Sequence, residues 1–430
     1  MKPKKEIIKR PKGMHDILPD DFAFLDKIIE TAREISEFYG FSPIATPHVE
    51  HAELFLRPLG ETSEVVEKQM YTFKTRGGDY LALRPEGTAP VMRAYDENGM
   101  VSWPHPVKLY YFGSFFRHEN TQKGRYREFR QFGLEVLGEG DPMLDALSIK
   151  VFYLILSELG FKNVMVRVNT LGDKNCRPAF KRELTNYYKK KFNYLCKDCK
   201  RRFKENPLRL LDCKEESCLE IKSGAPKMLD YLCGDCKEHF KIVLEFLEEG
   251  QIPYTLDNYL VRGFDYYGKT VFEVFLENEG DGKQIALGGG GRYDELMSTL
   301  GGKSLSATGW GMGLERVMSE MKKNNIAPKT QQNPKVFLVQ IGPAAKKKSF
   351  TLVEEFRKHG IAVAESLSKD NFRAQLKIAS KVGARAALII GQKEAMDGTI
   401  IVRDMEDETQ EMVTQDKLIE KVKSMLKKKK

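Results

Sequence analysis

The sequence predicts an α+β fold in which a sheet is flanked by helices and a small α/β domain follows. Three observations lead to this prediction. Residues 108–138 contain two apolar strands joined by a polar loop that ends in glycine, which is typical of a hairpin. Residues 171–258 are helical, lysine-rich and cysteine-rich. Residues 335–430 alternate short apolar strands with helices, as small α/β domains do.

The length and charge of the chain favour a multidomain protein with an anionic partner. Its 430 residues are 41% hydrophobic, which is enough for two or three domains with separate cores. The net charge is +9, and lysines gather at both ends and along residues 181–204. No apolar run reaches the about 20 residues that span a bilayer, and the basic N-terminus lacks the apolar block of a secretory signal. We expect a soluble cytoplasmic enzyme with no membrane association.

The first predicted helix is amphipathic and follows a turn at residues 13–19. Apolar side chains recur at helical spacing from Phe22 to Phe38. We expect a cap near Asp20 or Asp21 and an end at Gly40.

The second strand of the hairpin carries different side chains on its two faces. Alternation places one set of residues on one face, namely Arg125, Arg127, Phe129, Gln131, Gly133 and Glu135. It places core side chains on the other face, namely Tyr126, Phe132, Leu134 and Val136. Polar groups along an apolar sheet cost free energy unless a partner satisfies them. A solvated strand is the alternative, but the flanking aromatic residues favour a central strand that binds a ligand with both an anion and a cation.

Several strings of the sequence resemble a known family. Residues 116–119, FRHE, and 127–129, REF, resemble motif two of the class II aminoacyl-tRNA synthetases. Residues 40–50 resemble motif one, and residues 313–316, GLER, resemble motif three. The string RGFDYY at residues 262–267 resembles a signature of histidyl-tRNA synthetases in particular. The sequence is identified as a member of that family, and the resemblance spans nearly the whole chain.

The resemblance implies a class II antiparallel sheet flanked by helices, and a division into four regions. These are the first part of the catalytic core at 1–170, a helical insertion at 171–258, the second part of the core at 259–325, and an anticodon-binding domain at 335–430. It also implies a homodimer and a histidine–tRNA ligase activity. Such an enzyme activates L-histidine with ATP to histidyl-adenylate and pyrophosphate, then transfers histidine to the 3′ end of its cognate tRNA.

The resemblance also implies the site residues. The histidine-binding set is Glu86, Gly87, Thr88, Gln131, Glu135, Arg262, Tyr266, Tyr267 and Tyr293. Within it, Glu86 and Thr88 would bind the ammonium group, which offers three donors, and Glu135 and Tyr267 would bind the two ring nitrogens. The ATP-binding set is Arg117, Glu119, Arg125 and Arg316, with Mg²⁺ bridging the phosphates. Arg117 and Arg262 are the expected catalytic residues, because negative charge builds up on the α-phosphate that they would face.

The cysteines need a local explanation, because six of the seven lie between Cys196 and Cys236. The spacing of Cys196, Cys199, Cys233 and Cys236 is similar to that of a zinc ribbon. Structural zinc on these four thiolates and reduced thiols without a metal both stay open. Disulfides are disfavoured in a cytosolic enzyme.

Three other classes of protein are alternatives to the ligase. A regulatory subunit of ATP phosphoribosyltransferase resembles these synthetases, but such proteins lack the anticodon-binding domain and lose the motif arginines. Here those arginines are all present, namely Arg117, Arg125, Arg262 and Arg316. A pure RNA-binding module would show no histidine-dependent exchange between ATP and pyrophosphate. A class I synthetase is disfavoured, because its HIGH and KMSKS signals are missing from the sequence.

Overall fold

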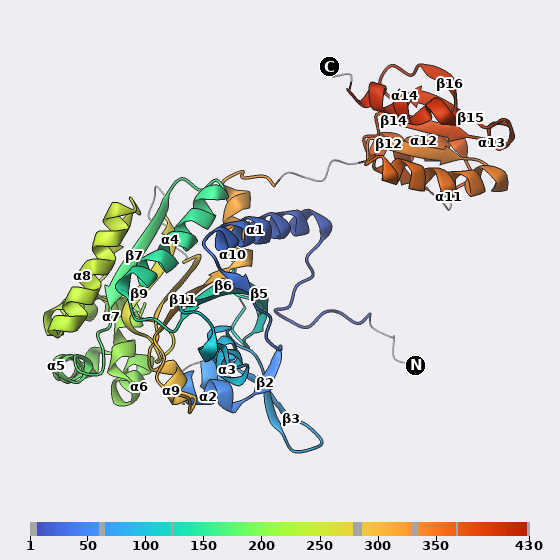
Figure 1. Ribbon diagram of the computed structural model, residues 1–430. Helices are drawn as coiled ribbons and strands as arrows, with labels where there is room; N and C mark the ends of the chain where they lie inside the picture. The colour runs from blue at the N-terminus through green and yellow to red at the C-terminus, as the bar shows by residue number, and fades with distance from the viewer. Residues whose placement is uncertain are drawn as a thin grey trace, which may run out of the picture. The chain divides into compact units, whose positions relative to one another are not determined.

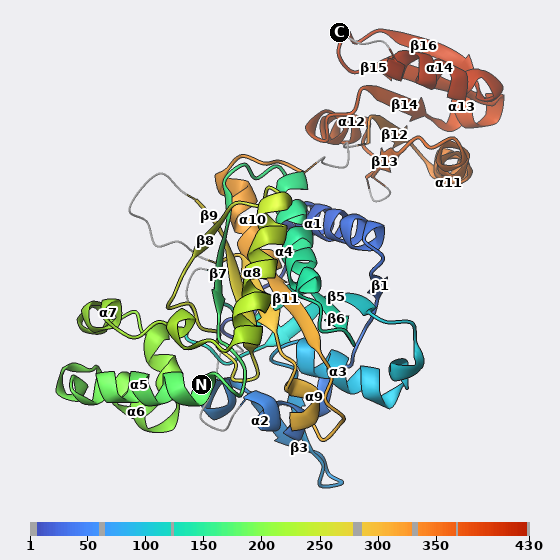
Figure 2. The same ribbon diagram turned by 60° about the vertical axis from the view of Figure 1, so that its left-hand side comes forward.

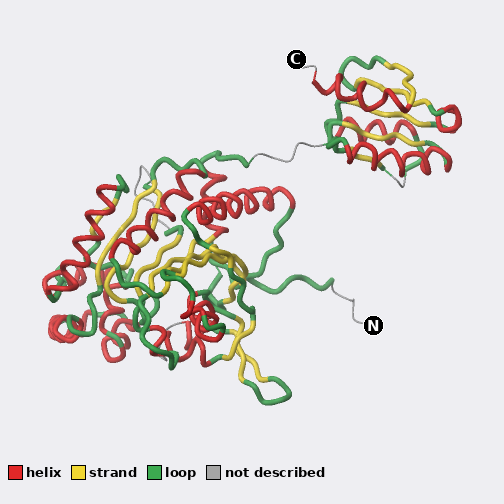
Figure 3. The backbone as a smooth tube through the Cα atoms, in the orientation of Figure 1, coloured by secondary structure: helices red, strands yellow, loops and turns green. Residues whose placement is uncertain are grey.

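The computed structural model describes residues 7–59, 65–121, 124–277, 286–328, 334–366 and 369–427. The chain divides into two compact units, Met1–Lys329 and Thr330–Lys430. Each unit contains its own sheet and its own apolar core (Figures 1 and 3).

The first unit is built on an eight-stranded sheet. Its strands are β1 (Ser42–Pro43), β5 (Val107–Phe116), β6 (Glu128–Leu137), β7 (Val164–Thr170), β8 (Tyr254–Leu256), β9 (Gly268–Leu276), β10 (Gly288–Arg292) and β11 (Ala307–Gly313). Their order in the sheet is β1-β5-β6-β11-β10-β9-β7-β8. All neighbours from β5 to β7 are antiparallel, whereas β1 and β8 join the two ends in parallel. The expected antiparallel sheet is confirmed.

Four helices cover one face of this sheet (Figure 2). They are α1 (Pro19–Phe38), α4 (Pro142–Glu158), α8 (Gly234–Glu249) and α10 (Leu314–Lys323). Their apolar side chains pack on Phe132, Leu134 and Val136 of β6, which are fully buried. This is the core face that alternation predicts for the second hairpin strand. The opposite face of β6 is therefore free to carry polar side chains.

Helix α1 differs from its predicted start. It begins at Pro19 after Leu18, and no side chain caps its first turn. Asp20 and Asp21 lie inside that turn, where their charges favour the positive end of the helix dipole. The helix ends just before Gly40, as predicted, and Gly40 has a φ of 80° that favours glycine.

A second layer lies against the other face of the sheet, in a separate apolar cluster. It contains a three-stranded antiparallel sheet in the order β2-β4-β3, formed by β2 (Val49–His51), β4 (Tyr80–Leu83) and β3 (Tyr71–Lys74). The short elements around it are α2 (Glu53–Leu59), η1 (Val65–Gln69), α3 (Thr88–Glu97), η2 (Met100–Ser102) and α9 (Leu296–Thr299). The turn between β4 and α3 brings Glu86 and Thr88 to this face of the main sheet.

The inserted region is helical, but its last part packs with the main sheet. Its elements are α5 (Arg177–Lys189), η3 (Phe192–Tyr194), α6 (Lys197–Glu205), η4 (Pro207–Asp212), α7 (Glu216–Ser223) and η5 (Met228–Tyr231). After them, α8 contributes Val243 and Leu247 to the core of the helix layer, and β8 pairs with β7. The residues from 234 onward therefore pack as part of the first unit's main layers.

The second unit is a small α/β domain with a mixed sheet. Its strands are β12 (Val336–Gln340), β13 (Val363–Glu365), β14 (Ala386–Ile390), β15 (Thr399–Asp404) and β16 (Gln410–Thr414), in the order β13-β12-β14-β15-β16. Its helices are α11 (Pro343–Lys358), α12 (Phe372–Lys381), α13 (Gln392–Asp397) and α14 (Gln415–Lys427). β12 is parallel to β13 and β14, whereas β15 and β16 continue the sheet antiparallel. Helices α11 and α14 pack on one face and α12 on the other.

Candidate active site

Glu135 on β6 is fully buried, and its carboxylate accepts three hydrogen bonds. The Thr88 and Tyr111 hydroxyls donate to Oε1 over 2.8 Å and 3.1 Å, and the Tyr293 hydroxyl donates to Oε2. Burial raises the pKa of Glu135 to about 8, although the bonds from Tyr293, Thr88 and Tyr111 act to lower it. The carboxyl therefore changes its charge close to neutral pH.

Glu86 is the second buried carboxylate, at the start of α3. Its two oxygens accept hydrogen bonds from the backbone N–H groups of Thr88 at 2.6 Å and Ala89 at 2.9 Å. Burial raises the pKa of Glu86, and these two bonds and the charge of Arg117 oppose the rise. Thr88 joins the two acidic groups, since its backbone binds Glu86 and its hydroxyl binds Glu135. Two desolvated carboxylates in one place suit a ligand that carries a cation.

Three glycines leave the space that this cluster occupies. A Cβ atom on Gly133 would lie 2.2 Å from the Tyr111 ring, and one on Gly87 would lie 2.4 Å from it. A Cβ atom on Gly309 would lie 1.8 Å from Glu135 Oε2. Gly133 faces Tyr111 across β5 and β6, and Gly309 faces Glu135 across β6 and β11. The side chains of Tyr111 and Glu135 thus each extend over a glycine of the neighbouring strand, which has no side chain to block them.

Three tyrosines close this part of the site. The ring centroids of Tyr266 and Tyr267 are 4.7 Å apart, and Tyr293 lies 5.8 Å from the first and 6.1 Å from the second. All three side chains are buried, and burial raises the pKa of each phenol. The structure thus brings the predicted tyrosines together beside Glu135.

Arg117, directly after β5, lies within electrostatic reach of Glu86. Its Nε donates to the Pro85 carbonyl over 2.8 Å, and its guanidinium carbon lies 5.1 Å from the centroid of Phe129 and 5.4 Å from that of Phe264. Burial lowers the pKa of Arg117, and the charge of Arg262 lowers it as well. The negative charges of Glu119 and Glu86 act in the opposite direction and raise it. Both arginines therefore lie within electrostatic reach of each other.

Arg262 approaches from the loop before β9. Its Nη1 donates to Glu273 Oε1 over 2.7 Å, and its guanidinium carbon lies 5.6 Å from the centre of the Tyr267 ring. A Cβ atom on Gly289 of β10 would lie 2.7 Å from the same Nη1. The glycine strand thus allows the guanidinium group to lie close to the backbone of the sheet.

Arg316, in the first turn of α10, completes the group of cations. Its Nη1 donates to the Ala286 carbonyl over 2.8 Å, and its Nε to the Gly124 carbonyl over 3.2 Å. Burial lowers the pKa of Arg316, and the charges of Arg125 and Arg117 lower it further. Arg125 itself lies 3.7 Å from Glu119. Converging guanidinium groups are suited to a polyphosphate.

Other residues of the site differ in how the structure places them. Gln131 lies beside Gly311, where a Cβ atom would be 3.3 Å from the Gln131 amide nitrogen. Residues 122 and 123, within the string that resembles motif two, lie outside the described residues.

Two residues of the site, Tyr111 and Glu273, were not predicted from the sequence. A tyrosine facing a glycine across the hairpin was the signal that could have identified Tyr111.

The zinc ligands predicted from spacing are wrong, because the two Cys-x2-Cys strings lie in different clusters. The predicted set was Cys196, Cys199, Cys233 and Cys236. The structure forms two other groups, one of Cys196, Cys199, Cys213 and Cys218, and one of Asp173, Cys176, Cys233 and Cys236. The spacing pattern does not include Cys176, because this residue precedes the cysteine-rich run by twenty positions.

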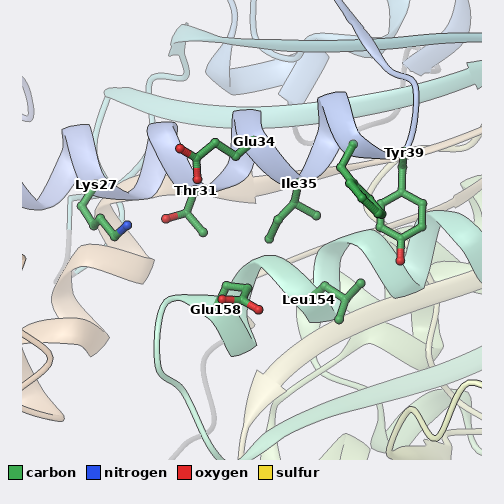
Figure 4. Close-up of a pocket in the computed structure, with 8 residues that line it drawn as sticks. Lys27, Thr31, Glu34, Ile35, Tyr39, Leu154 and Glu158 are labelled. Atoms are coloured by element: carbon green, nitrogen blue, oxygen red, sulfur yellow. The ribbon is translucent and has the colours of Figure 1, made fainter.

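A hollow of about 350 Å³ lies elsewhere in the first unit, between α1 and α4 (Figure 4). Thr31 and Ile35 of α1 face Leu154 and Glu158 of α4 across it. None of the predicted site residues lines this hollow.

Comparison with known proteins covers both units. A family model described as histidyl-tRNA synthetase matches residues 13–174 and 214–317, and an anticodon binding domain model matches residues 335–425. A histidine–tRNA ligase of Desulfitobacterium hafniense is 44% identical over 398 residues, which is 93% of each chain. One of Pelotomaculum thermopropionicum is 42% identical over 92% of this chain and 93% of its own. The apo S. aureus histidyl-tRNA synthetase structure matches with a TM-score of 0.80 and 33% identity, over 96% of this chain and 99% of its own.

The antiparallel sheet, its helix layer and the domain that follows define a class II aminoacyl-tRNA synthetase with an anticodon-binding domain. The chain belongs to the histidyl-tRNA synthetase family, whose members are ligases. A Bacillus halodurans protein, described as an ATP phosphoribosyltransferase regulatory subunit/histidyl-tRNA synthetase, shares the fold with a TM-score of 0.65 at 22% identity. Among the described helices, none is both long and apolar enough to cross a bilayer.

Proposed function

We propose that this chain joins L-histidine to the 3′ end of its cognate tRNA, with ATP as the energy source. The observation that carries the proposal is that Thr88 joins the buried carboxylates of Glu86 and Glu135, while Glu86 also interacts with the charge of Arg117. Arg117 in turn lies within electrostatic reach of Arg262. Histidine carries an ammonium group, a ring with two nitrogens, and a carboxylate that must reach a phosphate. It therefore needs buried anions and clustered cations in one site.

The imidazole ring is proposed to lie between Glu135 and Tyr267. An ionised Glu135 accepts a hydrogen bond from one ring N–H, and the Tyr267 hydroxyl meets the other nitrogen. Tyr266 and Tyr293 pack around the ring and exclude water. A ligand without these two nitrogens would leave buried polar groups without partners, so the site would reject it strongly.

The ammonium group is proposed to lie near Glu86, Thr88 and Gln131. Thr88 uses its hydroxyl proton to bind Glu135, which leaves the lone pairs of its oxygen free to accept from the ammonium group. Glu86 supplies negative charge from a carboxylate that α3 holds in place. Gly87 contributes space, because a side chain there would displace Tyr111.

Arg117 and Arg262 are proposed to act on the α-phosphate of ATP. The histidine carboxylate attacks the α-phosphorus, a carboxylate–phosphate bond forms, and the bond to pyrophosphate breaks. Negative charge builds up on the α-phosphate and on the leaving group, so cations fixed in place stabilise the transition state. Arg125 and Arg316 would hold the γ end of ATP. Glu119 has the oxygen ligands that Mg²⁺ prefers, and the ion when bound would neutralise charge on the phosphates.

The second step is proposed to involve both units of the chain. A ribose hydroxyl at the 3′ end of the tRNA takes the histidyl group, and AMP leaves. We assign anticodon recognition to the second unit, on the match of residues 335–425 to the anticodon binding domain model. The basic α6, with Lys197, Lys200 and Arg202, would approach the acceptor arm. With tRNA as substrate, we place the reaction in the cytoplasm.

The proposal also includes a homodimer formed through α1 and the edge of the sheet beside it. Phe38 of α1 is 83% exposed, and Phe112 of β5 is 52% exposed. Exposed aromatic side chains of this kind mark interaction surfaces, and a two-fold interface would cover them in both copies. Sedimentation equilibrium should give twice the chain mass of 49.2 kDa, whereas a monomer at micromolar concentration would contradict the dimer.

Exchange of pyrophosphate into ATP, measured with each of the twenty amino acids, tests the reaction. We expect exchange with histidine alone. Histidine binding without any exchange would instead assign the chain to the regulatory relatives. Exchange with a different amino acid would refute the specificity that we assign to Glu135 and Tyr267.

A further inference from the structure

All seven cysteines of the sequence lie in two clusters in and around the inserted region, and all are free thiols. The first, which we call the α6 cluster, consists of Cys196, Cys199, Cys213 and Cys218. The second, the α8 cluster, consists of Asp173, Cys176, Cys233 and Cys236. In each, the four ligand atoms lie within 4.8 Å of one another. Every thiol of the chain therefore lies in a group of four potential metal ligands.

The spacing of the sulfur atoms in the α6 cluster fits a tetrahedral metal ion. The Sγ atoms of Cys196 and Cys213 are 3.8 Å apart. Four thiolates around zinc, with Zn–S bonds of about 2.3 Å, define a tetrahedron with edges of about 3.8 Å. A disulfide would require about 2.05 Å between the two atoms. Cys199, Cys213 and Cys218 are buried, so the centre is closed to water in the way of structural zinc sites.

Backbone N–H groups point at sulfur atoms of the α6 cluster. The N–H of Cys199 donates to Cys196 Sγ, and the N–H of Cys196 donates to Cys218 Sγ, both over 3.4 Å. Cys196 is also the N-cap residue of α6, where the helix dipole favours negative charge. These contacts stabilise thiolates, which are the form of cysteine that binds metals.

The α8 cluster repeats the arrangement with one carboxylate. The N–H of Cys233 donates to Cys176 Sγ over 3.1 Å, and Cys233 is the N-cap residue of α8. Asp173 Oδ1 accepts from the backbone N–H groups of Asn175 at 2.9 Å and Cys176 at 3.1 Å. These bonds orient the carboxylate toward the three thiols, as the partners of a metal-binding carboxylate do.

We propose that the chain binds two structural zinc ions, one on the four thiolates of the α6 cluster and one on the three thiolates and Asp173 of the α8 cluster. Zinc accepts thiolate and carboxylate oxygen ligands in four-coordinate sites. The proposal stands on the geometry of the clusters and does not depend on the ligase reaction.

An arginine close in sequence to each cluster contacts the loop that carries Arg262 and Tyr267. Arg177, next to Cys176, donates from Nη2 to the Tyr267 carbonyl. Arg209, between Cys199 and Cys213, donates to Asp265 Oδ1 over 3.3 Å and also to the Gly263 carbonyl. The two ions would thus fix the inserted region as a support for this loop.

Metal content tests the proposal on the full chain purified without chelators. Elemental analysis should find two zinc ions per chain. Cys218→Ser and Cys236→Ser should each retain one, and the control Ser223→Ala, at an exposed position of α7, should retain two. Asp173→Asn should lose zinc from the α8 cluster only. If both cysteine variants lost all metal, or if one ion per chain were found in the parent, the two-site assignment would be overturned.

Two measurements on the unmutated chain keep the proposal testable if a variant fails to fold. Cobalt(II) added to chelator-treated chain should produce thiolate-to-metal charge-transfer absorption that saturates at two equivalents. A thiol reagent should find no reactive cysteine in the native zinc-loaded chain and seven after denaturation with a chelator. Less than about 0.2 zinc per chain, together with absent cobalt absorption, would refute both sites.

Discussion

The Thr88 hydroxyl donates a hydrogen bond of 2.8 Å to Oε1 of Glu135. The residue expected at the ammonium group of histidine and the residue expected at its ring are therefore in direct contact. Because Glu135 also accepts from Tyr111 and Tyr293, this carboxylate is the centre of the histidine site that we propose.

Replacing Glu135 by glutamine should reduce kcat/KM for histidine by roughly 100-fold, because a charged acceptor for a buried donor is worth about 3 kcal/mol. Pyrophosphate exchange at varied histidine concentration measures the effect. Glu97→Gln changes an exposed carboxylate of α3 that pairs with Arg93, and it should leave the kinetics unchanged. Equal activity of Glu135→Gln and the parent would remove Glu135 from the binding site.

The activity should also depend on pH through Glu135. Burial raises the pKa of its carboxyl to about 8, so the acid is mostly protonated at pH 7 in the free protein. The ionised form accepts a stronger hydrogen bond from the ring N–H, so kcat/KM for histidine should rise between pH 7 and pH 9 as Glu135 loses its proton. The free histidine ring is already neutral there, because an unperturbed imidazole has a pKa of about 6.5. A flat profile over this range would contradict the assignment.

Arg262→Ala should block adenylate formation while histidine still binds. By analogy with lost oxyanion donors, the barrier should rise by roughly 3–4 kcal/mol, or several hundredfold in rate. Single-turnover adenylation and calorimetric binding of histidine separate the two effects. Arg57→Ala, which removes an exposed arginine paired with Glu53, is the control. Near-normal adenylation by Arg262→Ala would exclude a role at the α-phosphate.

Gly309→Ala should prevent histidine binding, because the new Cβ would lie 1.8 Å from Glu135 Oε2. Moving the carboxylate would break its contacts with Thr88 and Tyr293, and overpacking alone costs about 1–3 kcal/mol. Calorimetry and thermal unfolding should show lost affinity and a lower Tm. Gly77→Ala is the matched control, since its Cβ would meet atoms no closer than 3.6 Å. Unchanged affinity in Gly309→Ala would contradict the geometry described for Glu135.

Asp145 should be important for stability and not for the chemistry. It lies 2.8 Å from Nη2 of the buried Arg292 and 2.8 Å from His239 Nε2, and Arg292 immediately precedes Tyr293. Asp145→Asn should lower the free energy of unfolding by about 3 kcal/mol, because it removes the buried one of the two carboxylates that pair with Arg292 and leaves only Asp294. Denaturant unfolding measures this change, and the control is Asp21→Asn, which removes a half-buried carboxylate paired with Lys322 at the surface.

The same ion pair has a defined pH dependence. Burial alone would raise the pKa of Asp145, but Arg292 and His239 lower it to about 2 from an ordinary value of 3.8. A carboxyl whose pKa is depressed by folding contributes stability that is present above the ordinary value and lost as the pH falls toward 2. The difference in unfolding free energy between parent and Asp145→Asn should therefore shrink below pH 3.8. A difference that stayed constant down to pH 2 would contradict this role.

Much of the sheet could be predicted from local patterns, since alternation in residues 131–136 separates core from polar side chains. The extent of the inserted region could not be predicted from local patterns. Local periodicity identifies α8 as a helix, but only its packing on α4 and the pairing of β8 with β7 join it to the main layers.

The site shows the same division between local and long-range information. Arg262 lies in a string that resembles a family motif, and Glu135 lies on the polar strand face that alternation predicts. Tyr111 lies in no such string and is defined by its position opposite Gly133. The cysteine pairs were misassigned because Cys-x2-Cys spacing reports two ligands of a site and not the partners that the fold brings to them.

A crystal structure with a non-hydrolysable histidyl-adenylate analogue tests the central claim most directly. Our account requires Glu135 and Tyr267 to contact the two ring nitrogens, with Arg117 and Arg262 on the oxygens that replace the α-phosphate. If the analogue bound with its ring away from Glu135, or with neither arginine near its phosphate mimic, the account would be contradicted.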